Sequence, residues 1–324
     1  MNKRFLFFLF LGGLISCSNW SSKENAFIPE SSGNINHVTV VMPEKDWNST
    51  LGKTVRSKME QIYEGLPLDE PQYSVVYMPP KAFTGFARQS RNIIWFRKDS
   101  TAQFQLIKDQ FARPQIVALV SGDDADVQGF YFEENETLIR QTFAENERIE
   151  KLRRIQKSPT TEKTLYERFG ISLIYPSAYT TFKDTTNFVW IQKPVRKGHL
   201  NIIAYTLPEN ALNGNIAARV PDIRDSIGEV YVPGRLDGSY LITERAFLPY
   251  YYKTELDGKM SYLTKGTWEV ANDYMAGPFI NYMVKDTLNK RWLAIEGFAF
   301  APSESKREYM FELNTIISTL KHQQ

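Results

Sequence analysis

The first seventeen residues constrain this chain most, because they contain its only cysteine, Cys17. Lys3 and Arg4 precede an apolar run that starts at Phe5 and is too short to cross a membrane, which takes about 20 residues. This pattern predicts a secretory signal that is removed after residue 16. The exported body must then fold without a disulfide, a cysteine nucleophile or a thiolate metal site.

The residues around the expected cleavage site have the spacing of a bacterial lipobox, with Leu14 at minus three, Ser16 at minus one and then Cys17. In this respect the chain resembles bacterial lipoproteins, in which the cysteine is acylated and becomes the new N-terminus. The alternative is ordinary secretion with a free thiol. Acylation would anchor the protein stably, since each buried methylene contributes about 0.8 kcal/mol. We therefore expect Cys17 to be the lipid-attachment residue.

The residue after Cys17 suggests where the lipid anchor is placed. Ser18 and Asn19 follow it, so the aspartate that holds some lipoproteins in the inner membrane is missing. We expect a cell-envelope protein, anchored in the outer membrane and facing the periplasm. Residues 17–36 are rich in Ser, Asn and Glu and predict a lipidated tether that is too polar to pack.

Charge argues against nucleic acid as a partner. Removing residues 1–16 takes Lys3 and Arg4 from the 39 basic side chains and leaves all 37 acidic ones, so the mature chain is close to neutral. Nucleic-acid-binding proteins carry a basic excess on one face. The expected partners are the membrane, through the lipid on Cys17, and an envelope protein or glycan.

Residues 37–157 predict an α+β domain. Strand patterns at 37–42, 73–78, 92–97 and 115–120 are separated by a helix pattern that starts near Asp46 and by a shorter one marked by Phe104, Ile107 and Phe111. The resulting order, β-α-β-β-α-β, is that of ferredoxin-like domains, in which a four-stranded antiparallel sheet carries two helices on one face. A helix with acids at its start and bases at its end follows at 133–157.

Residues 158–324 predict a second α+β domain, after a joint at Ser158 and Pro159. Seven strand patterns follow a short helix that ends at Gly170, and Asp257-Gly258 is typical of a type I′ hairpin. Ser305 and Glu308 have the spacing of a capping box for a C-terminal helix. We expect an antiparallel sheet with this helix across it. The opening segment of the domain, 169–176, and its closing segments, 296–302 and 305–321, resemble the PsbP-like α-β-α sandwich.

Several further segments carry a resemblance over nearly the whole mature chain, and they are residues 91–94, 113–115, 187–191, 266–269, 272–279 and 296–302. They are similar to a domain-of-unknown-function family of lipoproteins from Bacteroidota, in which Gly is usual where this chain has Ala276. The resemblance implies an envelope lipoprotein and brings no catalytic residue.

Catalytic motifs do not stand out in the sequence. It contains three histidines, His37, His199 and His322, and no GxSxG, HExxH or glycine-rich phosphate loop, so we expect no cofactor and no histidine-based metal site. Asp123, Asp124 and Asp126 are a weak candidate for a cation site, because they lack the spacing of a calcium loop. A turn that leads into a helix is the competing interpretation.

One stretch of the second domain combines polar groups with large aromatic side chains in what the pattern predicts to be a loop with a sharp Gly-Pro turn. Its residues are Trp268, Glu269, Asn272, Asp273, Met275, Gly277, Pro278 and Phe279. The competing interpretation is a packed turn at the end of a sheet. We expect a non-enzymatic binding or assembly module for another envelope component that uses this loop or the groove between the domains. The alternative is an envelope hydrolase with paired carboxylates.

Overall fold

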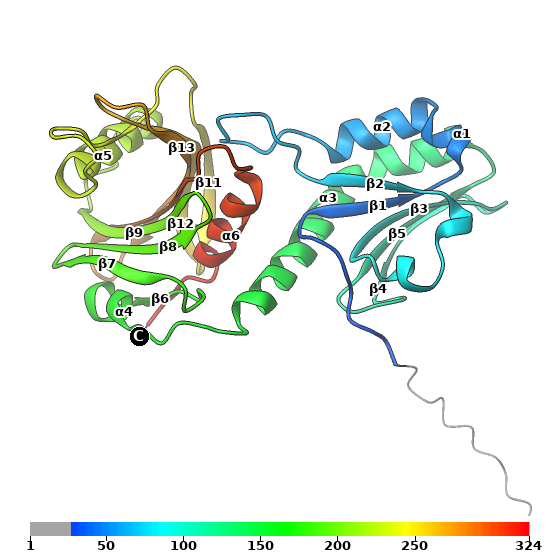
Figure 1. The fold of residues 1–324 in the computed structure, drawn as a ribbon, viewed down its shortest axis with the longest axis horizontal. Helices are drawn as coiled ribbons and strands as arrows, with labels where there is room; N and C mark the ends of the chain where they lie inside the picture. The colour runs from blue at the N-terminus through cyan, green and yellow to red at the C-terminus, as the bar shows by residue number, and fades with distance from the viewer. Residues whose placement is uncertain (1–26, 324) are drawn as a thin grey trace, which may run out of the picture.

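The computed structural model describes residues 27–323. The predicted signal peptide and Cys17 lie outside the described residues. Two lobes are visible in Figure 1, each built around its own sheet, with the helices α3 and α6 between them. None of the helices in the described part of the chain is long and apolar enough to cross a membrane.

The first lobe contains a five-stranded mixed sheet in the order β2-β1-β3-β5-β4. Its elements are β1 (His37–Val41), α1 (Glu44–Trp47), α2 (Thr50–Met59), β2 (Ser74–Met78), β3 (Asn92–Lys98), β4 (Gln103–Lys108), β5 (Ile116–Gly122) and α3 (Ala125–Ile155). Two 3₁₀ turns, η1 (Pro80–Ala82) and η2 (Gly85–Gln89), connect β2 to β3. The pairs β1–β2, β1–β3 and β3–β5 are parallel, whereas β4 runs antiparallel to β5.

The α+β class of this lobe is confirmed, but its predicted ferredoxin-like topology is wrong, because that fold requires an antiparallel sheet. The segment predicted as a second helix contains the edge strand β4. Phe104 packs with the cluster beneath α2 and α3, while Ile107 and Phe111 pack with the cluster on the opposite face of the sheet. Phe104 and Ile107 on the two faces of β4, together with Phe111 in the loop after it, produced the helix-like spacing.

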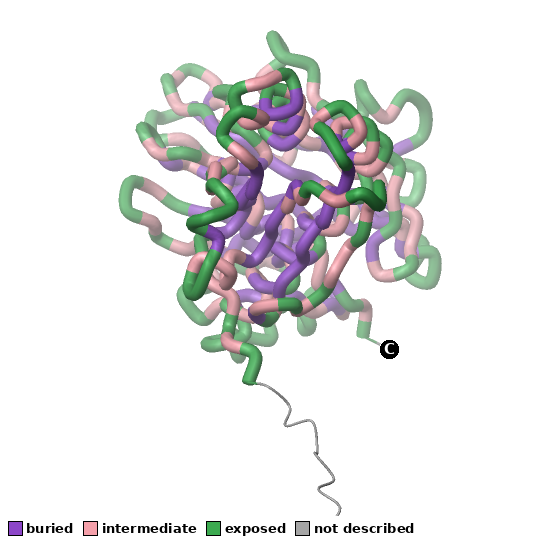
Figure 2. The backbone as a smooth tube through the Cα atoms, turned by 90° about the vertical axis from the view of Figure 1, so that its right-hand side faces the viewer, coloured by how far each residue is buried: buried purple, intermediate pink, exposed green. Residues whose placement is uncertain are grey.

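The two faces of the first sheet are covered differently. Leu51 and Val55 of α2 and Phe132 and Phe143 of α3 pack on one face. On the other face the η1–η2 segment contributes the buried Phe83. Figure 2 looks onto this lobe and shows buried strands running through its centre, with exposed loops at the rim. A sheet with both faces covered is typical of parallel strands, because crossover connections lie over its faces.

The predicted tether extends too far along the chain. Ser31 N–H donates to the carbonyl of Arg113 at 3.0 Å and Ser32 N–H donates to that of Gln89 at 2.8 Å, and Ile35 and Asn36 are buried. This segment packs although its side chains are polar, because its backbone N–H groups donate hydrogen bonds to the first lobe. Residues 30–36 therefore belong to the folded lobe.

The second lobe contains an eight-stranded antiparallel sheet in the order β10-β12-β13-β14-β9-β8-β7, and β11 also pairs with β12. Its strands are β7 (Thr180–Thr185), β8 (Phe188–Val195), β9 (Gly198–Pro208), β10 (Leu241–Thr243), β11 (Tyr250–Leu256), β12 (Lys259–Val270), β13 (Ala276–Asp286) and β14 (Arg291–Phe300). The helices are α4 (Thr164–Phe169), α5 (Ile216–Tyr231) and α6 (Arg307–Ile317). A short pair, β6 (Ile171–Ser172) with β15 (Lys321–His322), closes the chain.

Helices cover both faces of this sheet. Leu313 and Ile317 of α6 pack on one face, and Val220 and Ile223 of α5 pack on the other. The predicted antiparallel sheet with a C-terminal helix, arranged as an α-β-α sandwich, is confirmed. The sequence reading missed α5.

Several local predictions in the second lobe are also confirmed. Gly170 ends α4 with a φ of +70°, which favours glycine. Asp257 and Gly258, with φ values of +54° and +68°, connect β11 to β12 as a type I′ hairpin requires.

Candidate functional site

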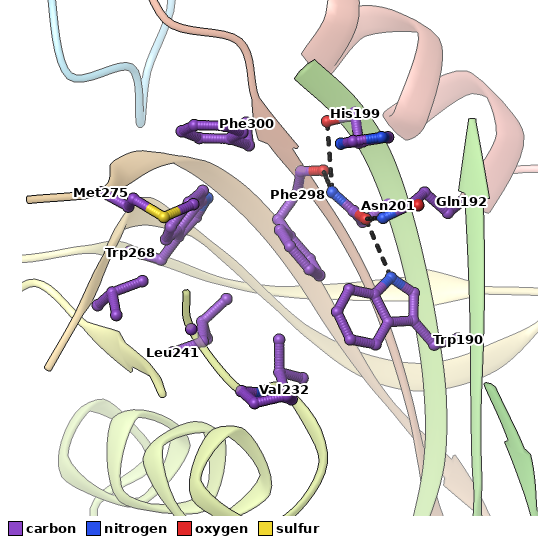
Figure 3. Close-up of a pocket in the computed structure, with 13 residues that line it drawn as sticks. Trp190, Gln192, His199, Asn201, Val232, Leu241, Trp268, Met275, Phe298 and Phe300 are labelled. Carbon is purple, nitrogen blue, oxygen red and sulfur yellow. Dashed lines mark hydrogen bonds between the residues drawn. The ribbon is translucent and has the colours of Figure 1, made fainter. Parts of the chain in front are cut away.

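A cavity of about 150 Å³ lies on the face of the second sheet that α5 covers, between the sheet and the segment after α5. Figure 3 shows aromatic side chains around it. Its lining consists of Trp190, Gln192, His199, Asn201, Val232, Pro233, Gly234, Leu241, Trp268, Val270, Met275, Phe298 and Phe300.

The period of a β-strand explains how these side chains come together. Successive side chains of a strand point to opposite faces, so residues two apart share a face. The lining residues occur in such pairs, namely Trp190 with Gln192 on β8, His199 with Asn201 on β9, Trp268 with Val270 on β12 and Phe298 with Phe300 on β14. Four strands therefore each present two residues to one cavity.

The walls of the cavity are inclined aromatic rings. Trp268 and Phe298 are T-shaped at 77° with centroids 5.8 Å apart, and Trp190 is tilted by 46° against Phe298 at 6.1 Å. Trp190, Trp268 and Phe298 are buried, whereas Met275 and Phe300 are half-buried and His199 and Pro233 are exposed. The mouth of the cavity therefore lies beside the latter four residues.

Asn201 is the central polar residue of the site, and its amide group is fully used. Its Oδ1 accepts from Trp190 Nε1–H and from Gln192 Nε2–H, both at 3.0 Å, and its Nδ2 donates to the carbonyls of His199 and Phe298 at 3.3 and 3.4 Å. Figure 3 shows part of this network. Asn201 therefore fixes the orientation of the Trp190 ring and has no hydrogen-bonding group left over for a ligand.

Trp268 differs from Trp190, because its buried Nε1–H has no hydrogen-bond acceptor among the described residues. A buried donor without an acceptor costs about 1–3 kcal/mol. Gly277 makes room for this indole ring, since a Cβ atom there would lie 3.0 Å from Trp268 Nε1 and would also collide with the carbonyl oxygen of Ala299.

Acidic residues with buried carboxylates lie elsewhere, in the first lobe. Glu147 of α3 accepts from Arg91 Nε–H at 3.0 Å and from Asn92 Nδ2–H at 2.6 Å, and its neighbour Glu150 is bound by Arg153 and Arg154. Burial raises the pKa of Glu147 to about 7, although Arg91 acts in the opposite direction. Arginines bind both oxygens of Glu150, whereas Arg91 and Asn92 bind only Oε1 of Glu147, and its buried Oε2 has no partner among the described residues.

Asp123, Asp124 and Asp126, the candidate cation residues, are not arranged as a metal site. Asp124 is the N-cap of α3, where its Oδ1 accepts from Val127 N–H at 2.9 Å. Residues 27–323 contain no group of three His, Cys, Asp or Glu side chains placed to hold a metal ion. The position of Asp124 therefore supports the competing interpretation, a turn that leads into the helix α3.

The chain matches two families, each described as a domain of unknown function. Residues 158–319 match DUF4837, and residues 31–156 match DUF8532. The chain belongs to the DUF4837 family. No curated protein matches this DUF4837 chain.

Two solved structures of the protein Mog1 show a weak structural likeness to this DUF4837 chain. One is a mutant with 9% identity and the other is the Saccharomyces cerevisiae Ran-binding protein Mog1p with 8% identity. Each has a TM-score of 0.32 and covers 47% of this chain and 90% of its own. Human StAR-related lipid transfer protein 5 has 8% identity and a TM-score of 0.24, over 54% of this chain and 97% of its own.

The predicted binding loop of this DUF4837 chain is distributed over several environments. Trp268 and Met275 line the cavity, Asn272 forms the hairpin turn with a φ of +65°, and Asp273 pairs with Arg235 at 3.1 Å. Glu269 is half-buried on β12 opposite Ala276.

The predicted sharp turn at Gly277-Pro278 is wrong, because both residues lie in β13, opposite Trp268 and Thr267 of β12. The chain reverses earlier, between residues 271 and 275, where Asn272 supplies the positive φ. Phe279 is a core residue that stacks on Arg224, whose Cζ is 3.4 Å from the ring centroid.

The sequence reading missed most of the cavity, including Trp190, His199, Asn201, Phe298 and Phe300. Aromatic and polar side chains two residues apart in predicted strands were the signal that could have found them. That signal gives the shared face within each strand, but not which strands are neighbours.

Proposed function

We propose that this chain is an envelope lipoprotein of the Bacteroidota family type, anchored through an acylated Cys17, and that it binds another envelope component in the cavity of its second lobe. The observation that carries the binding role is the cavity itself, a concave site with aromatic walls and a half-exposed mouth. Ligand sites are typically concave, mostly apolar and equipped with a few placed polar groups. Gln192 and His199 are polar residues of this lining.

A non-enzymatic role agrees with the chemistry of the lining. The cavity is lined by no Asp, Glu, Lys, Arg, Ser or Cys among the described residues, so it presents neither a carboxylate pair nor a nucleophile. The buried carboxylates of Glu147 and Glu150 lie in the first lobe, where they form ion pairs with arginines of the same lobe.

Site-specific photo-crosslinking in intact cells tests this function. A benzophenone amino acid at Met275, beside the mouth, should give a discrete crosslinked product. The same group at Leu288, which is exposed on the hairpin between β13 and β14, is the matched control and should not. A Cys17→Ala variant should lose acyl labelling and membrane association and should also lose the crosslink.

Two results would contradict the proposal. Equal crosslinking from Met275 and Leu288 would remove the cavity as the binding site. Membrane retention of the Cys17→Ala variant would remove the lipid anchor.

A further inference from the structure

We infer that the cavity binds an apolar group without hydrogen-bonding atoms, about as large as one phenyl ring, and that a partner protein presents this group as a side chain. The inference rests on the proposed binding function and names the chemistry of the bound group. Four properties of the site lead to it: the size of the cavity, the charge of its lining, the state of its hydrogen-bonding groups and the side chains beside its mouth.

Size limits the bound group to about one ring. The cavity measures about 150 Å³, and an apolar cavity of that size holds a molecule such as benzene. Trp190, Trp268 and Phe298 are inclined to one another and offer both edges and faces to such a ring (Figure 3). Edge-to-face contacts between rings are favourable beyond the area that they bury. A phenylalanine side chain therefore has the size and the shape that the cavity accepts.

Charge excludes an ionic group. The described lining includes no Lys, Arg, Asp or Glu side chain that could neutralise a buried ion. Transfer of an unpaired ion into an apolar site is strongly unfavourable. The bound group is therefore neutral.

The buried hydrogen-bonding side chains of the lining are either bonded within the protein or packed against its backbone. Trp190 Nε1–H donates to Asn201 Oδ1, and Asn201 Nδ2 donates to two backbone carbonyls. Trp268 Nε1 is buried, and this edge of the ring packs on Gly277, where a Cβ atom would lie 3.0 Å from it. These three side chains therefore offer a ligand ring surface rather than hydrogen bonds.

The other two polar side chains of the lining lie farther out. Gln192 is half-buried and His199 is exposed at the mouth. A hydroxyl or amide group that entered the cavity past them would lose its hydrogen bonds to water without a replacement, which is unfavourable. The part of the ligand that enters the cavity is therefore apolar.

Exposed side chains beside the mouth indicate a protein partner. Tyr274, next to Met275 in the chain, is fully exposed, and Leu236, in the loop after α5, is 45% exposed. Arg235 pairs with Asp273 at 3.1 Å and so joins the two loops that carry them. In protein–protein interfaces one side chain of a partner commonly fills an apolar pocket, while aromatic and polar residues around the pocket cover the contact. A free compound of one ring would leave Tyr274 and Leu236 uncovered.

Binding of p-xylene and hydroquinone to the soluble body of the protein, residues 18–324, tests the chemistry of the group. The two probes have nearly the same shape, with a methyl or a hydroxyl group at each end of the ring, so one hydroxyl of hydroquinone must enter the cavity. Hydroquinone, kept reduced, should bind at least about fivefold more weakly than p-xylene, the low end of the effect of a buried hydroxyl without a partner.

Nuclear magnetic resonance places the probe. In ¹⁵N spectra p-xylene should shift the indole signals of Trp190 and Trp268, each identified by its loss in the corresponding Trp→Phe variant. The indole signal of Trp47, which lies in the first lobe, should not shift.

Variants localise the binding. Met275→Trp places a large ring at the mouth and should abolish binding of p-xylene. Tyr274→Trp adds the same ring at the neighbouring residue, which is fully exposed and does not line the cavity, and should bind p-xylene like the wild type.

Photo-crosslinking in intact cells tests the source of the group. A benzophenone amino acid at Met275 should attach a protein to the chain, and the same amino acid at Tyr274 should attach the same protein, because both residues lie beside the mouth. A product from Met275 that carries only the mass of a small compound would overturn the protein partner.

The wild-type comparison keeps the inference falsifiable even if a variant does not fold. Equal or tighter binding of hydroquinone, or no binding of p-xylene at about 1 mM, would overturn the apolar group.

The two proposals fail differently. A protein crosslinked from Met275 without binding of p-xylene would refute the chemistry of the group and leave the binding function. Binding of p-xylene without any crosslink from Met275 would do the reverse.

Discussion

Glu147 shows how a single buried residue can make stability depend on pH. Its side chain is fully buried on α3, and burial raises its pKa to about 7, against the opposing effect of Arg91. In the unfolded chain a glutamate has a pKa of about 4.3. The folded state therefore binds a proton more tightly than the unfolded state, so the stabilisation is complete below about pH 4 and is lost as the pH rises through 7.

We expect the free energy of unfolding of the wild type, measured with urea, to fall between pH 5 and 8 by up to about 3 kcal/mol on account of Glu147. In Glu147→Gln the decline should be smaller, because the amide oxygen still accepts from Arg91 and Asn92 but does not titrate. Glu145→Gln is the control on the same helix, since Glu145 is bonded to the half-exposed Arg148 at the surface. An unchanged slope in Glu147→Gln would contradict the assignment.

At the scale of elements, one buried residue fixes α5 to the second sheet. Arg224 of α5 donates two hydrogen bonds to Glu296 of β14, both at 2.7 Å, and also donates to Thr243 of β10. Both charged side chains are 1% exposed. Breaking a buried ion pair by removing one partner costs about 3–5 kcal/mol, because the other charge stays buried and unpaired.

Arg224→Met should therefore destabilise the protein by about 3–5 kcal/mol in urea unfolding. Arg219→Met on the same helix is the control, since Arg219 is exposed and bonds only to the carbonyl of Ala211. It should cost no more than about 1 kcal/mol. A loss below about 1 kcal/mol in Arg224→Met would show that other contacts hold α5 in place.

At the scale of the whole molecule, the segment between α2 and β2 joins the two lobes. Its Glu64 accepts from Tyr252 at 2.7 Å and from Lys265 at 2.9 Å. Its Glu70 accepts from the backbone N–H groups of Lys306 and Arg307 at 2.7 and 3.0 Å, at the start of α6. The predicted capping box of Ser305 and Glu308 is therefore wrong, because a carboxylate of the other lobe takes its place.

Loss of this cap should be measurable by hydrogen exchange. In Glu70→Ala the amides of Lys306 and Arg307 should exchange faster and the stability should fall by about 1 kcal/mol, the typical effect of removing a cap. Asp69→Ala changes the exposed neighbouring acid and should leave both unchanged. Unaltered exchange at these two amides in Glu70→Ala would rule out a capping role for Glu70.

The sequence alone determined the features that depend on neighbouring residues. The α+β class, the end of α4 at Gly170, the Asp257-Gly258 hairpin and the apolar face of α6 follow from local backbone preferences and from periodicity. Of the eight residues in the predicted binding loop, Trp268 and Met275 line the cavity. They were found because they lie together in the chain.

Only the tertiary structure decided which strands are neighbours. β4 was mistaken for a helix because Phe104 and Ile107 on its two faces and Phe111 in the loop after it had a helix-like spacing, and the parallel pairs of the first sheet join residues far apart in the sequence. The cavity likewise collects residue pairs from β8, β9, β12 and β14. Strand pairing and burial depend on the free energy of the whole packed sheet, which no local pattern contains.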